Sequence, residues 1–355
     1  MKVLFILFTI AMVIIYILSY VNPHSFPFIN FSSVVLPYLS IFTLSVSFIS
    51  LLALKKNRSV SILSILLALF ILKSHINFGF GSRAETADDI QLLSYNVSFF
   101  SVPTVFKEVY YQRENNQTVF SILERVDSLN PDIISFQEFF NDKKSPFYDV
   151  VQQLENKGYY SYLKSSPRHH NGTDRGIITF SKYPIVDKGV ICESKNTYNG
   201  AIYTDLKINT KDTIRLINAH LTSMAFYSKS SNPLQLMKQF YYAYSTATRE
   251  RISQLQEIQE MIDSSPHPIV LTGDLNETPD SYLYKQLESS LENAYETTGK
   301  GISPTYSSKI PGLAFRIDHI FYDEAILNTS FETYKDWKLS EHNAIKASLE
   351  LTSND

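Results

Sequence analysis

Residues 269–281 read IVLTGDLNETPDS, and this stretch joins an apolar strand to a group of polar side chains. The strand stops at Gly273, and Asp274 and Asn276 follow it. Two residues apart on an extended chain, these two side chains project from the same side. A carboxylate beside an amide can orient a water molecule and hold a phosphoryl oxygen. The alternative is a plain turn, because Asp and Asn both favour turns.

Polar residues also end other apolar strands. A buried strand that stops on charged residues needs a partner or a function for them. Glu138 follows the apolar residues of DIISFQEFF (132–140), and a glutamate there is a hard oxygen ligand for Mg²⁺ or Ca²⁺; the alternative is a solvated strand-end charge. The others are Asn96 in LLSYNV (92–97), His220 in LINAHLTS (216–223), Asp318 in FRIDHIFYD (315–323), and Glu341 and His342 ahead of the last strand. A lone histidine such as His220 is more often structural than catalytic, so a structural role is the alternative here.

The pattern beyond residue 88 predicts many short strands and few helices. Strands are expected at 90–95, 133–136, 176–181, 201–208, 213–219, 268–272, 316–322 and 344–351, from apolar runs and period-two alternation. Helices are expected at 117–129, 148–157 and 246–262. This order favours an α/β domain with packed sheets and outer helices over a regular βαβ repeat.

Three apolar segments precede this domain: Val3–Tyr20, about Val34–Leu54 and about Val60–Leu72. A transmembrane helix needs about 20 apolar residues, so the third segment spans a bilayer only if Ser74–Phe80 contributes. A signal peptide is the alternative for the first segment. It is disfavoured because no A-x-A-like cleavage site follows and two further apolar segments do.

Basic residues predict the topology of these segments. Lys55, Lys56 and Arg58 follow the second segment and place that loop inside, because positive residues stay on the cytoplasmic side. Three spans then put the N-terminus inside and the C-terminal domain outside; an interfacial third helix would put the domain inside. The expected division is a membrane region with about three transmembrane helices (1–80), a polar linker (81–88) and a catalytic domain (89–355).

Charge is distributed unevenly along the chain. The whole sequence has a net charge of −3, but residues 1–83 contain no Asp or Glu, which leaves a net charge of about −9 from Ala84 onward. A domain this acidic has no global basic field to attract nucleic acid, although a local basic groove would serve that purpose. The single cysteine, Cys192, excludes an intrachain disulfide. No zinc-ligand spacing and no glycine-rich phosphate loop is present in the sequence.

Taken in chain order, these motifs resemble the endonuclease/exonuclease/phosphatase superfamily, which includes deoxyribonucleases, sphingomyelinases and inositol-phosphate 5-phosphatases. A strand-end Asn, QE, GIITFSKYPI, HLTS, GDLN, RIDHIF and a final acid with His follow in the family order over about residues 88–352. The resemblance implies a four-layer α/β/β/α sandwich of two mixed sheets. It also implies a hydrolase of phosphodiester or phosphomonoester bonds that uses Mg²⁺ or Mn²⁺. Three apolar segments before such a domain are similar to a membrane-bound branch seen in Bacteroidetes-type bacteria.

The resemblance implies that Glu138 is the principal metal ligand, with Glu341 and Asn96 completing the metal and phosphate shell. Asp274 would orient and deprotonate the attacking water. The sequence departs from the family at Glu341, because the family usually has Ser-Asp-His where this chain has Ser-Glu-His. The longer side chain moves the carboxylate by about one methylene. Residue 98 is Ser, where some nucleases of the family have an acid.

The remaining roles concern the phosphate group. The resemblance implies that Asn276 binds the phosphate and that His342 contacts the phosphoryl oxygens and stabilises the developing charge. Asp318 would fix the orientation of the His342 ring. His220 would be a proton donor or a phosphate contact. Arg175, just ahead of the GIITFSKYPI strand, is a further candidate phosphate contact, or else a surface arginine.

Two aromatic-rich connections, residues 99–111 and 224–244, lie next to the motif strands. They are expected to select substrate or enter the membrane interface, where Tyr and Trp are favoured, or to pack as lids or core. The expected partners are the lipid bilayer and a phosphate ester, a lipid head group being favoured over nucleic acid; no protein partner is predicted. The expected location is a bacterial inner membrane, multi-pass, with the catalytic domain outside the cytoplasm. The alternatives are an exported nuclease and a catalytically weak, membrane-bound binding module.

Overall fold

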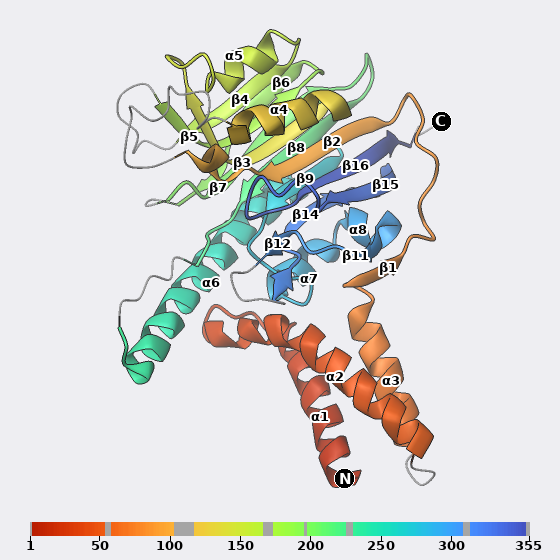
Figure 1. Cartoon of the computed structure of the whole chain (residues 1–355). Helices are drawn as coiled ribbons and strands as arrows, with labels where there is room; N and C mark the ends of the chain where they lie inside the picture. Colours follow the sequence, from red (N-terminus) through yellow and green to blue (C-terminus); the bar gives the residue numbers. More distant parts are fainter. Residues whose placement is uncertain are drawn as a thin grey trace.

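The computed structural model describes residues 2–53, 58–102, 117–165, 173–194, 197–224, 230–307 and 313–352. It has two visibly different parts, an α/β body and a group of N-terminal helices that projects from it (Figure 1). The helical part consists of α1 (Lys2–Leu18), a short 3-10 helix η1 (Pro27–Phe31), α2 (Ser32–Ala53) and α3 (Arg58–Leu72). The strands and helices described from residue 90 onward build the body, from which the first turns of one helix, residues 233–243, project.

The body contains two six-stranded sheets. The first has the order β15 (Ile326–Tyr334), β16 (Ala344–Leu351), β2 (Ile90–Asn96), β3 (Ile133–Asp142), β5 (Thr173–Ser181) and β4 (Tyr160–Ser165). The second has the order β10 (Glu292–Asn293), β14 (Asp318–Tyr322), β9 (Ile269–Asp274), β8 (Thr213–His220), β7 (Gly200–Lys207) and β6 (Ile185–Glu193). Both sheets are mixed: β2 pairs with β3 and β8 with β9 in parallel, and the other pairs are antiparallel. The predicted α/β class and the two mixed sheets are confirmed.

Helices cover the outer faces of both sheets. Side chains such as Leu92 and Ile133 of the first sheet and Leu216 and Val270 of the second form one buried cluster between the sheets. The helices α4 (Gln117–Leu129) and α5 (Val150–Glu155) pack on the outer face of the first sheet. The helices α6 (Pro233–Asp263) and α7 (Tyr282–Glu288) pack on that of the second. The result is a four-layer sandwich, because each sheet has two apolar faces to remove from water.

The smaller elements lie at the periphery. They are β1 (Ile76–Phe78), η3 (Ser98–Ser101), α8 (Ala294–Thr298), β11 (Lys300–Ile302), β12 (Tyr306–Ser307) and β13 (Ala314–Phe315). The strands β1 and β11 pair with each other, as do β12 and β13. The hairpin of β12 and β13 borders the candidate site described below.

The helix α6 is longer than the sequence predicts. We expected a helix over 246–262 after an aromatic connection, but residues 233–263 form one helix of 31 residues. Its start has a clear local cause: the Asn232 side chain accepts hydrogen bonds from the backbone N–H groups of Leu234 and Gln235, and Pro233 occupies the first turn. The prediction of a loop up to residue 244 was therefore wrong from residue 233 onward.

Only one apolar helix in the described residues is long enough to cross a bilayer. It covers Pro27–Leu52, 26 residues with a mean hydropathy of 2.0, whereas α1 and α3 have 17 and 15 residues. Fifteen residues extend about 22 Å, less than the roughly 30 Å of a hydrocarbon core. The expectation of three spans in a multi-pass arrangement is corrected to one such helix. Its length and composition are shared by membrane anchors and signal sequences.

The segment after α3 does not extend that helix as a third span would require. Ile76–Phe78 instead form β1, which pairs with β11 at the edge of the body. The predicted linker, residues 81–88, is held to the body: the Ser82 hydroxyl donates to the Thr298 carbonyl, and the Arg83 N–H donates to the Thr329 carbonyl. Of the basic residues used for topology, only Arg58 lies in the part of the chain that the structure describes.

Buried polar contacts fix the helical part to the body. The Asn30 amide of η1 lies 2.9 Å from both carboxylate oxygens of Glu277, which follows the GDLN motif. The Arg251 guanidinium of α6 pairs with the same carboxylate at 2.7 Å, and both of these side chains are 3% exposed. His75, just after α3, lies 2.7 Å from Asp280. The loop that carries Asn276 is therefore held by η1 on one side and by α6 on the other.

This arrangement predicts a large stability effect at Arg251. In Arg251→Met the Glu277 carboxylate stays buried without its charge partner, which is expected to destabilise the fold by about 3–5 kcal/mol. The full chain in detergent should then show a Tm lower by about 10 °C. The control is Arg249→Met, an exposed arginine on the same helix, for which a change within about 0.5 kcal/mol is expected. Equal shifts in the two variants would contradict a buried pair.

Candidate active site

The strand-end residues of both sheets meet at one end of the sandwich. Parallel pairing brings the carboxyl ends of β2 and β3 together in the first sheet and those of β8 and β9 in the second. Asn96 ends β2, and its amide donates to the Asp274 carboxylate at the end of β9 across a distance of 3.0 Å. His220 and Asp318 are both strand partners of Asp274. Side chains that lie as far apart in sequence as Asn96 and Asp318 therefore surround one carboxylate.

Asp274 is the centre of this group. It is buried, and its second oxygen accepts a hydrogen bond of 2.9 Å from the Asn276 backbone N–H. The nearest nitrogens of His220 and His342 each lie 3.6 Å from its carboxylate. Burial and the Asp318 charge raise the pKa of Asp274, while the two histidines oppose that shift. A carboxylate with a raised pKa is suited to accept a proton.

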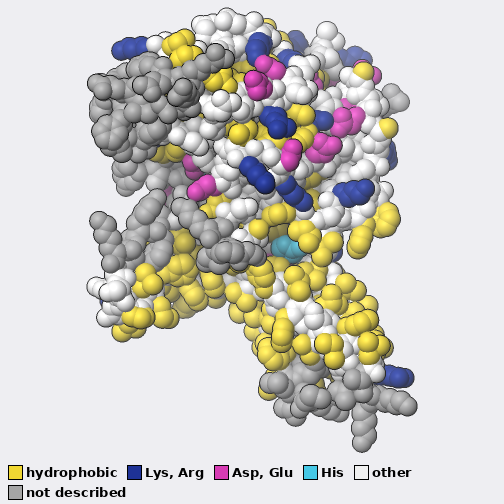
Figure 2. Space-filling model, in the orientation of Figure 1, with side chains coloured by type: hydrophobic (Ala, Val, Ile, Leu, Met, Phe, Trp, Pro, Cys, Tyr) yellow, Lys and Arg dark blue, Asp and Glu magenta, His cyan; other side chains and the backbone are white. Residues whose placement is uncertain are grey.

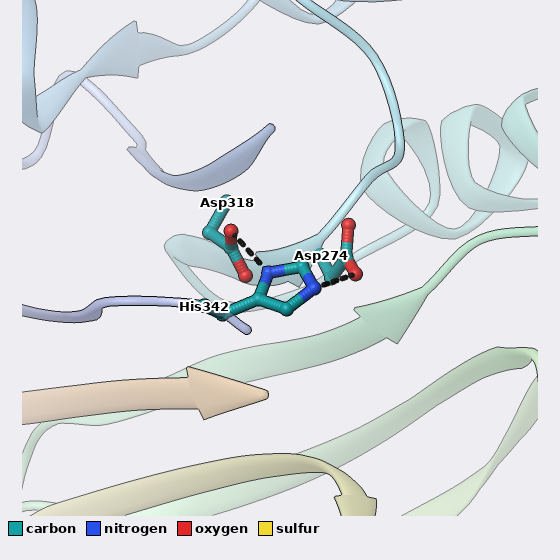
Figure 3. Close-up of side chains that lie close together, drawn as sticks. All are labelled: Asp274, Asp318 and His342. Carbon is teal, nitrogen blue, oxygen red and sulfur yellow. Dashed lines mark hydrogen bonds and ion pairs between the residues drawn. The ribbon is translucent and has the colours of Figure 1, made fainter. Parts of the chain in front are cut away.

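His342 lies between two carboxylates (Figure 3). Its Nδ1 is 2.8 Å from the Asp318 carboxylate, and its Nε2 faces Asp274. Burial alone would lower the pKa of His342, but the carboxylates of Asp318, Asp274 and Glu138 outweigh burial and raise that pKa to about 10. The ring is therefore a cation at neutral pH, with its orientation fixed by Asp318.

His220 has the opposite electrostatic state. Burial is the main cause of a lowered pKa for its ring, so the ring is neutral at pH 7. Among the described residues, neither of its nitrogens has a hydrogen-bond partner. The Nε2 atom lies 3.6 Å from Asp274 and 3.8 Å from Glu138. A buried imidazole with both nitrogens unused can bind a water molecule or a substrate oxygen.

The backbone at the site has unusual conformations that the motifs explain. Gly273 has φ of +132°, and a Cβ there would lie 1.9 Å from the Ala219 carbonyl oxygen on β8, so only glycine fits before Asp274. Glu138 and Asn276 have φ of +47° and +52°, in the left-handed region. Residues without glycine's freedom adopt this region at a cost, and such strain clusters at functional sites.

A sequence model described as the endonuclease/exonuclease/phosphatase family matches residues 93–342, which is more than half of the chain. This chain belongs to the endonuclease/exonuclease/phosphatase family. It is therefore a metal-dependent phosphoester hydrolase with a buried Asp/His group at its centre. No curated protein matches the chain.

Several solved structures share the fold. The human Nocturnin catalytic domain with bound sulfate is 18% identical, with a TM-score of 0.51, and the match covers 76% of this chain and 97% of that chain. A family protein from Bacteroides vulgatus is 20% identical, with a TM-score of 0.51, over 75% and 100%. TDP2 from D. rerio, complexed with a single strand DNA product, is 15% identical, with a TM-score of 0.52, over 74% and 99%. These identities establish a common fold only.

The donor atoms present fit the divalent metal of the endonuclease/exonuclease/phosphatase family. The Glu138 carboxylate is partly exposed, hydrogen-bonds Asn96 and lies in the electrostatic field of Glu341. Burial is the main cause of its raised pKa. Carboxylate and amide oxygens are the ligands that Mg²⁺ prefers. Asp274, Asp318 and His342 also offer ligand atoms within 4.8 Å of one another, but the Asp318–His342 hydrogen bond already uses two of the three groups. Glu138, Asn96 and Glu341 therefore remain the predicted metal-binding residues.

Two of the predicted substrate contacts, Asn276 and Arg175, have side chains that contact groups other than the Asp274 carboxylate. The Asn276 side chain donates to the Leu221 carbonyl at 3.0 Å. Arg175 is buried, with its guanidinium 4.9 Å from the Phe99 ring centre and 5.2 Å from that of Phe140. Its position between aromatic rings excludes the alternative of a free surface arginine. Its role as a phosphate contact stays a prediction.

The structure adds one residue outside the motifs, Tyr306, and gives a place to two motif residues that had no assigned role, Gln137 and Asn218. The Tyr306 ring lies 5.1 Å from the His342 ring, on the β12–β13 hairpin. The Gln137 amide donates to the Asn218 side chain at 2.8 Å, joining the two sheets beneath the site. Asn218 precedes His220 by two residues on the same strand, a spacing that was visible in LINAHL. Tyr306 gave no sequence signal, because it lies in a two-residue strand outside every motif.

Proposed function

We propose that this protein is a membrane-anchored phosphoesterase whose substrate is a phosphorylated lipid head group. The observation that carries the proposal is the arrangement around Asp274: this buried carboxylate has a raised pKa, and the cationic His342 and the neutral His220 each have a nitrogen 3.6 Å from it. Phosphate-ester hydrolysis needs an in-line nucleophile, a neutralised phosphoryl group and a stabilised leaving oxygen. The three side chains are suited to these tasks.

In the proposed mechanism, Asp274 orients the attacking water and takes its proton. The Asn96 amide and the Asn276 N–H, which both donate to Asp274, hold the carboxylate in position. His342 places a positive donor against the phosphoryl oxygens, and Asp318 keeps that ring charged and oriented. When bound, the divalent ion would supply Lewis acidity from the side of Glu138.

The leaving oxygen also needs a proton or a hydrogen bond. His220 is the strand partner of Asp274 on β8. Within the described part of the chain, neither of its ring nitrogens has a hydrogen-bond partner. A neutral imidazole carries one N–H donor, which we assign to the leaving oxygen or to a phosphate oxygen. Asn276 would contact the phosphate from the same loop.

The membrane assignment rests on the surface of the helical part. The helix α2 is long and apolar enough to cross a bilayer. The outward faces of α1 and α3 expose large apolar side chains, among them Leu7 and Ile17 on α1 and Leu63 and Leu66 on α3, each more than half exposed. Hydrophobic side chains cover these helices, whereas charged side chains are spread over the body (Figure 2). A continuous apolar surface of this kind on a soluble part would be unusual.

The proposal is tested by assaying the full chain in detergent with Mg²⁺. Bis-p-nitrophenyl phosphate and p-nitrophenyl phosphate report diesterase and monoesterase chemistry, and vesicles of phosphatidylcholine or phosphatidic acid report the corresponding lipid reactions. EDTA is expected to abolish turnover and Mg²⁺ to restore it. Cleavage of a single-stranded DNA oligonucleotide in preference to every lipid would instead support an exported nuclease and overturn the lipid proposal.

Glu138→Gln tests the metal assignment. The neutral amide is a weaker ligand, so the Mg²⁺ concentration for half-maximal rate should rise. Loss of a residue that only hydrogen-bonds a metal ligand costs roughly 10–100-fold in metal affinity, and loss of a direct ligand should cost at least as much. Glu324→Gln is the matched control, because Glu324 is an exposed acid on the β14–β15 connection. An unchanged Mg²⁺ dependence in Glu138→Gln would remove this residue from the metal site.

A further inference from the structure

The first three turns of α6 extend beyond the body and leave apolar side chains in the open. None of the side chains of residues 233–243 is fully buried, whereas Tyr244 and several later residues are. Leu234 is 76% exposed, Met237 69% and Tyr241 44%. These three residues recur at spacings of three and four, so they form a stripe along one face of the helix. A stripe of this size on a projecting helix needs an environment that covers it.

The same apolar side of α6 also packs on the entrance to α2, since Phe240, Tyr241 and Tyr244 lie three, four and seven residues beyond Met237. Phe240 lies 6.0 Å from the Phe31 ring of η1, and Tyr244 lies 5.6 Å from the same ring. Phe28 lies 5.8 Å from Tyr241. Figure 1 shows α6 descending from the body beside the N-terminal helices. The exposed stripe is therefore at the level of η1, which is where the apolar segment Pro27–Leu52 begins.

The lack of acidic residues in this region favours contact with a lipid surface over exposure to water. Residues 213–249 contain no Asp or Glu, and the projecting turns of α6 carry one charge, that of Lys238. The first 83 residues also lack acidic side chains. A helix with Leu, Met and Tyr on one face and lysine as its only charge matches a helix that lies in the head-group region of a bilayer. Tyrosine is enriched at that depth.

We propose that residues 233–242 of α6, together with Phe26 and Phe28, form a membrane-interface surface. We call it the α6–η1 surface. Phe26 is 71% and Phe28 45% exposed, and both directly precede or lie in the segment that leads into α2. The occupant of this surface is a phospholipid bilayer, because the surface is continuous with the apolar helix α2. This inference deepens the proposed function, on whose membrane part it rests.

This surface would also hold the candidate active site at a fixed distance from the membrane, because α6 contacts both. The same helix that carries the α6–η1 surface pairs with Glu277 through Arg251 and binds the Thr222 N–H through Gln254 at 3.0 Å. Glu277 directly follows Asn276, and Thr222 lies two residues after His220. A straight helix thus joins lipid contact at one end to the candidate active site at the other. Head groups of the same leaflet are the phosphate esters that such an arrangement favours.

The position of α6 is measured by labelling the full chain in nanodiscs of phosphatidylcholine and phosphatidylglycerol. Met237→Cys carries an environment-sensitive fluorophore, and Val186→Cys, an exposed apolar residue on β6 of similar exposure, is the control. The native Cys192 does not react, because burial raises the pKa of its thiol to about 12. We expect blue-shifted emission at position 237, quenched by lipids that carry a shallow spin label, and unquenched aqueous emission at position 186.

Several outcomes overturn the inference. Iodide quenching at position 237 equal to that at 186 would place this part of α6 in water. Burial of the label that grows with protein concentration in detergent, without lipid dependence, would assign the α6–η1 surface to a second copy of the chain. Either result would leave the proposed catalytic chemistry untouched, since the label reports position and not turnover.

A double variant, Leu234→Asp with Met237→Asp, separates membrane contact from catalysis. Hydrolysis of lipid in vesicles is expected to fall at least about tenfold, while hydrolysis of bis-p-nitrophenyl phosphate in detergent stays within about twofold of the parent. Equal activity on vesicle lipid in variant and parent would contradict the inference. Absence of turnover on every substrate in the parent would count against the proposed function, and the labelling result would still decide the position of α6.

Discussion

Asp274→Asn is expected to lower kcat on bis-p-nitrophenyl phosphate by about 10³-fold, within the range that a positioned general base contributes. The substitution keeps the size of the side chain and one of its acceptor oxygens, but an amide cannot take a proton from water. Asp274 accepts the hydrogen bonds from Asn96 and from the Asn276 backbone through two different oxygens, so the amide keeps one of them and loses the other, and the Tm of the variant is measured beside its turnover. The measurement is steady-state turnover of the full chain in detergent at saturating Mg²⁺.

A matched control separates this effect from loss of any buried carboxylate. Asp89 is also buried, and it accepts hydrogen bonds from Thr86 and Thr329 far from the site residues. Asp89→Asn makes the same chemical change and should leave kcat within about twofold of the parent. A similar loss in both variants would mean that Asp274 acts through stability, and the proposed base would have to be sought elsewhere.

His342→Gln is expected to lower kcat by about 10²–10³-fold, as removal of one donor to a developing oxyanion does. Asp318 contacts neither the water nor the phosphate in our mechanism: it orients and charges the His342 ring and also raises the pKa of Asp274, so it is a positioning residue. Asp318→Asn alone should therefore reduce kcat, but adding it to His342→Gln should change kcat no more than about threefold. Two effects that multiply in the double variant would show that Asp318 has an independent role.

The pH dependence of kcat tests the roles of His342 and Asp318 independently of the double variant. The cationic form of His342 is required, and nearby carboxylates raise the pKa of His342 to about 10, so titration of this ring should leave the activity intact at neutral pH and produce the alkaline limb of the profile, while protonation of Asp274 produces the acid limb. Asp318→Asn removes the largest of these opposing charges, which lowers the pKa of the ring. The alkaline limb of the profile should then move to lower pH. A limb that stays in place would contradict the proposed role of Asp318.

The central strands of the fold could be predicted from the sequence, and the edge strands could not. Every strand that we predicted, among them β2, β3, β8 and β9, lies inside a sheet. The four missed strands of the two large sheets are β4, β6, β10 and β15, which are the edges of those sheets. Edge strands face solvent on one side and carry polar residues along their length, as IVDKGVICE in β6 does. The apolar pattern that indicates a strand is therefore weakest where the sheet ends.

The helix α6 was underestimated for a different reason. Its core-facing half has ordinary apolar periodicity, and the prediction began there. The projecting half is rich in phenylalanine and tyrosine and carries one charged residue, Lys238, so no charged face marked it as a helix. The Asn232-Pro233 pair was the available signal, since asparagine caps helices and proline starts them.

The composition of the site followed from strand ends, but its connections did not. The sequence indicates that Asn96, His220 and Asp274 each end a strand. Parallel pairing of β8 with β9 brings His220 and Asp274 together, and Asn96 reaches Asp274 from the other sheet. It does not indicate that Asn30, from a different part of the chain, binds Glu277 next to the site. That contact depends on how an N-terminal segment docks, and no local pattern encodes docking between segments so far apart.

The Asn30–Glu277 contact has a consequence for biosynthesis. Its two residues are separated by 247 positions, so the N-terminal segment leaves the ribosome long before its partner is made. Chains emerge N-terminus first, and contacts of such long range form late in folding. The loop that carries Asn276 therefore cannot reach its final support until most of the polypeptide has been translated. A nascent chain would carry its N-terminal apolar helix throughout synthesis and complete the candidate active site only near the end.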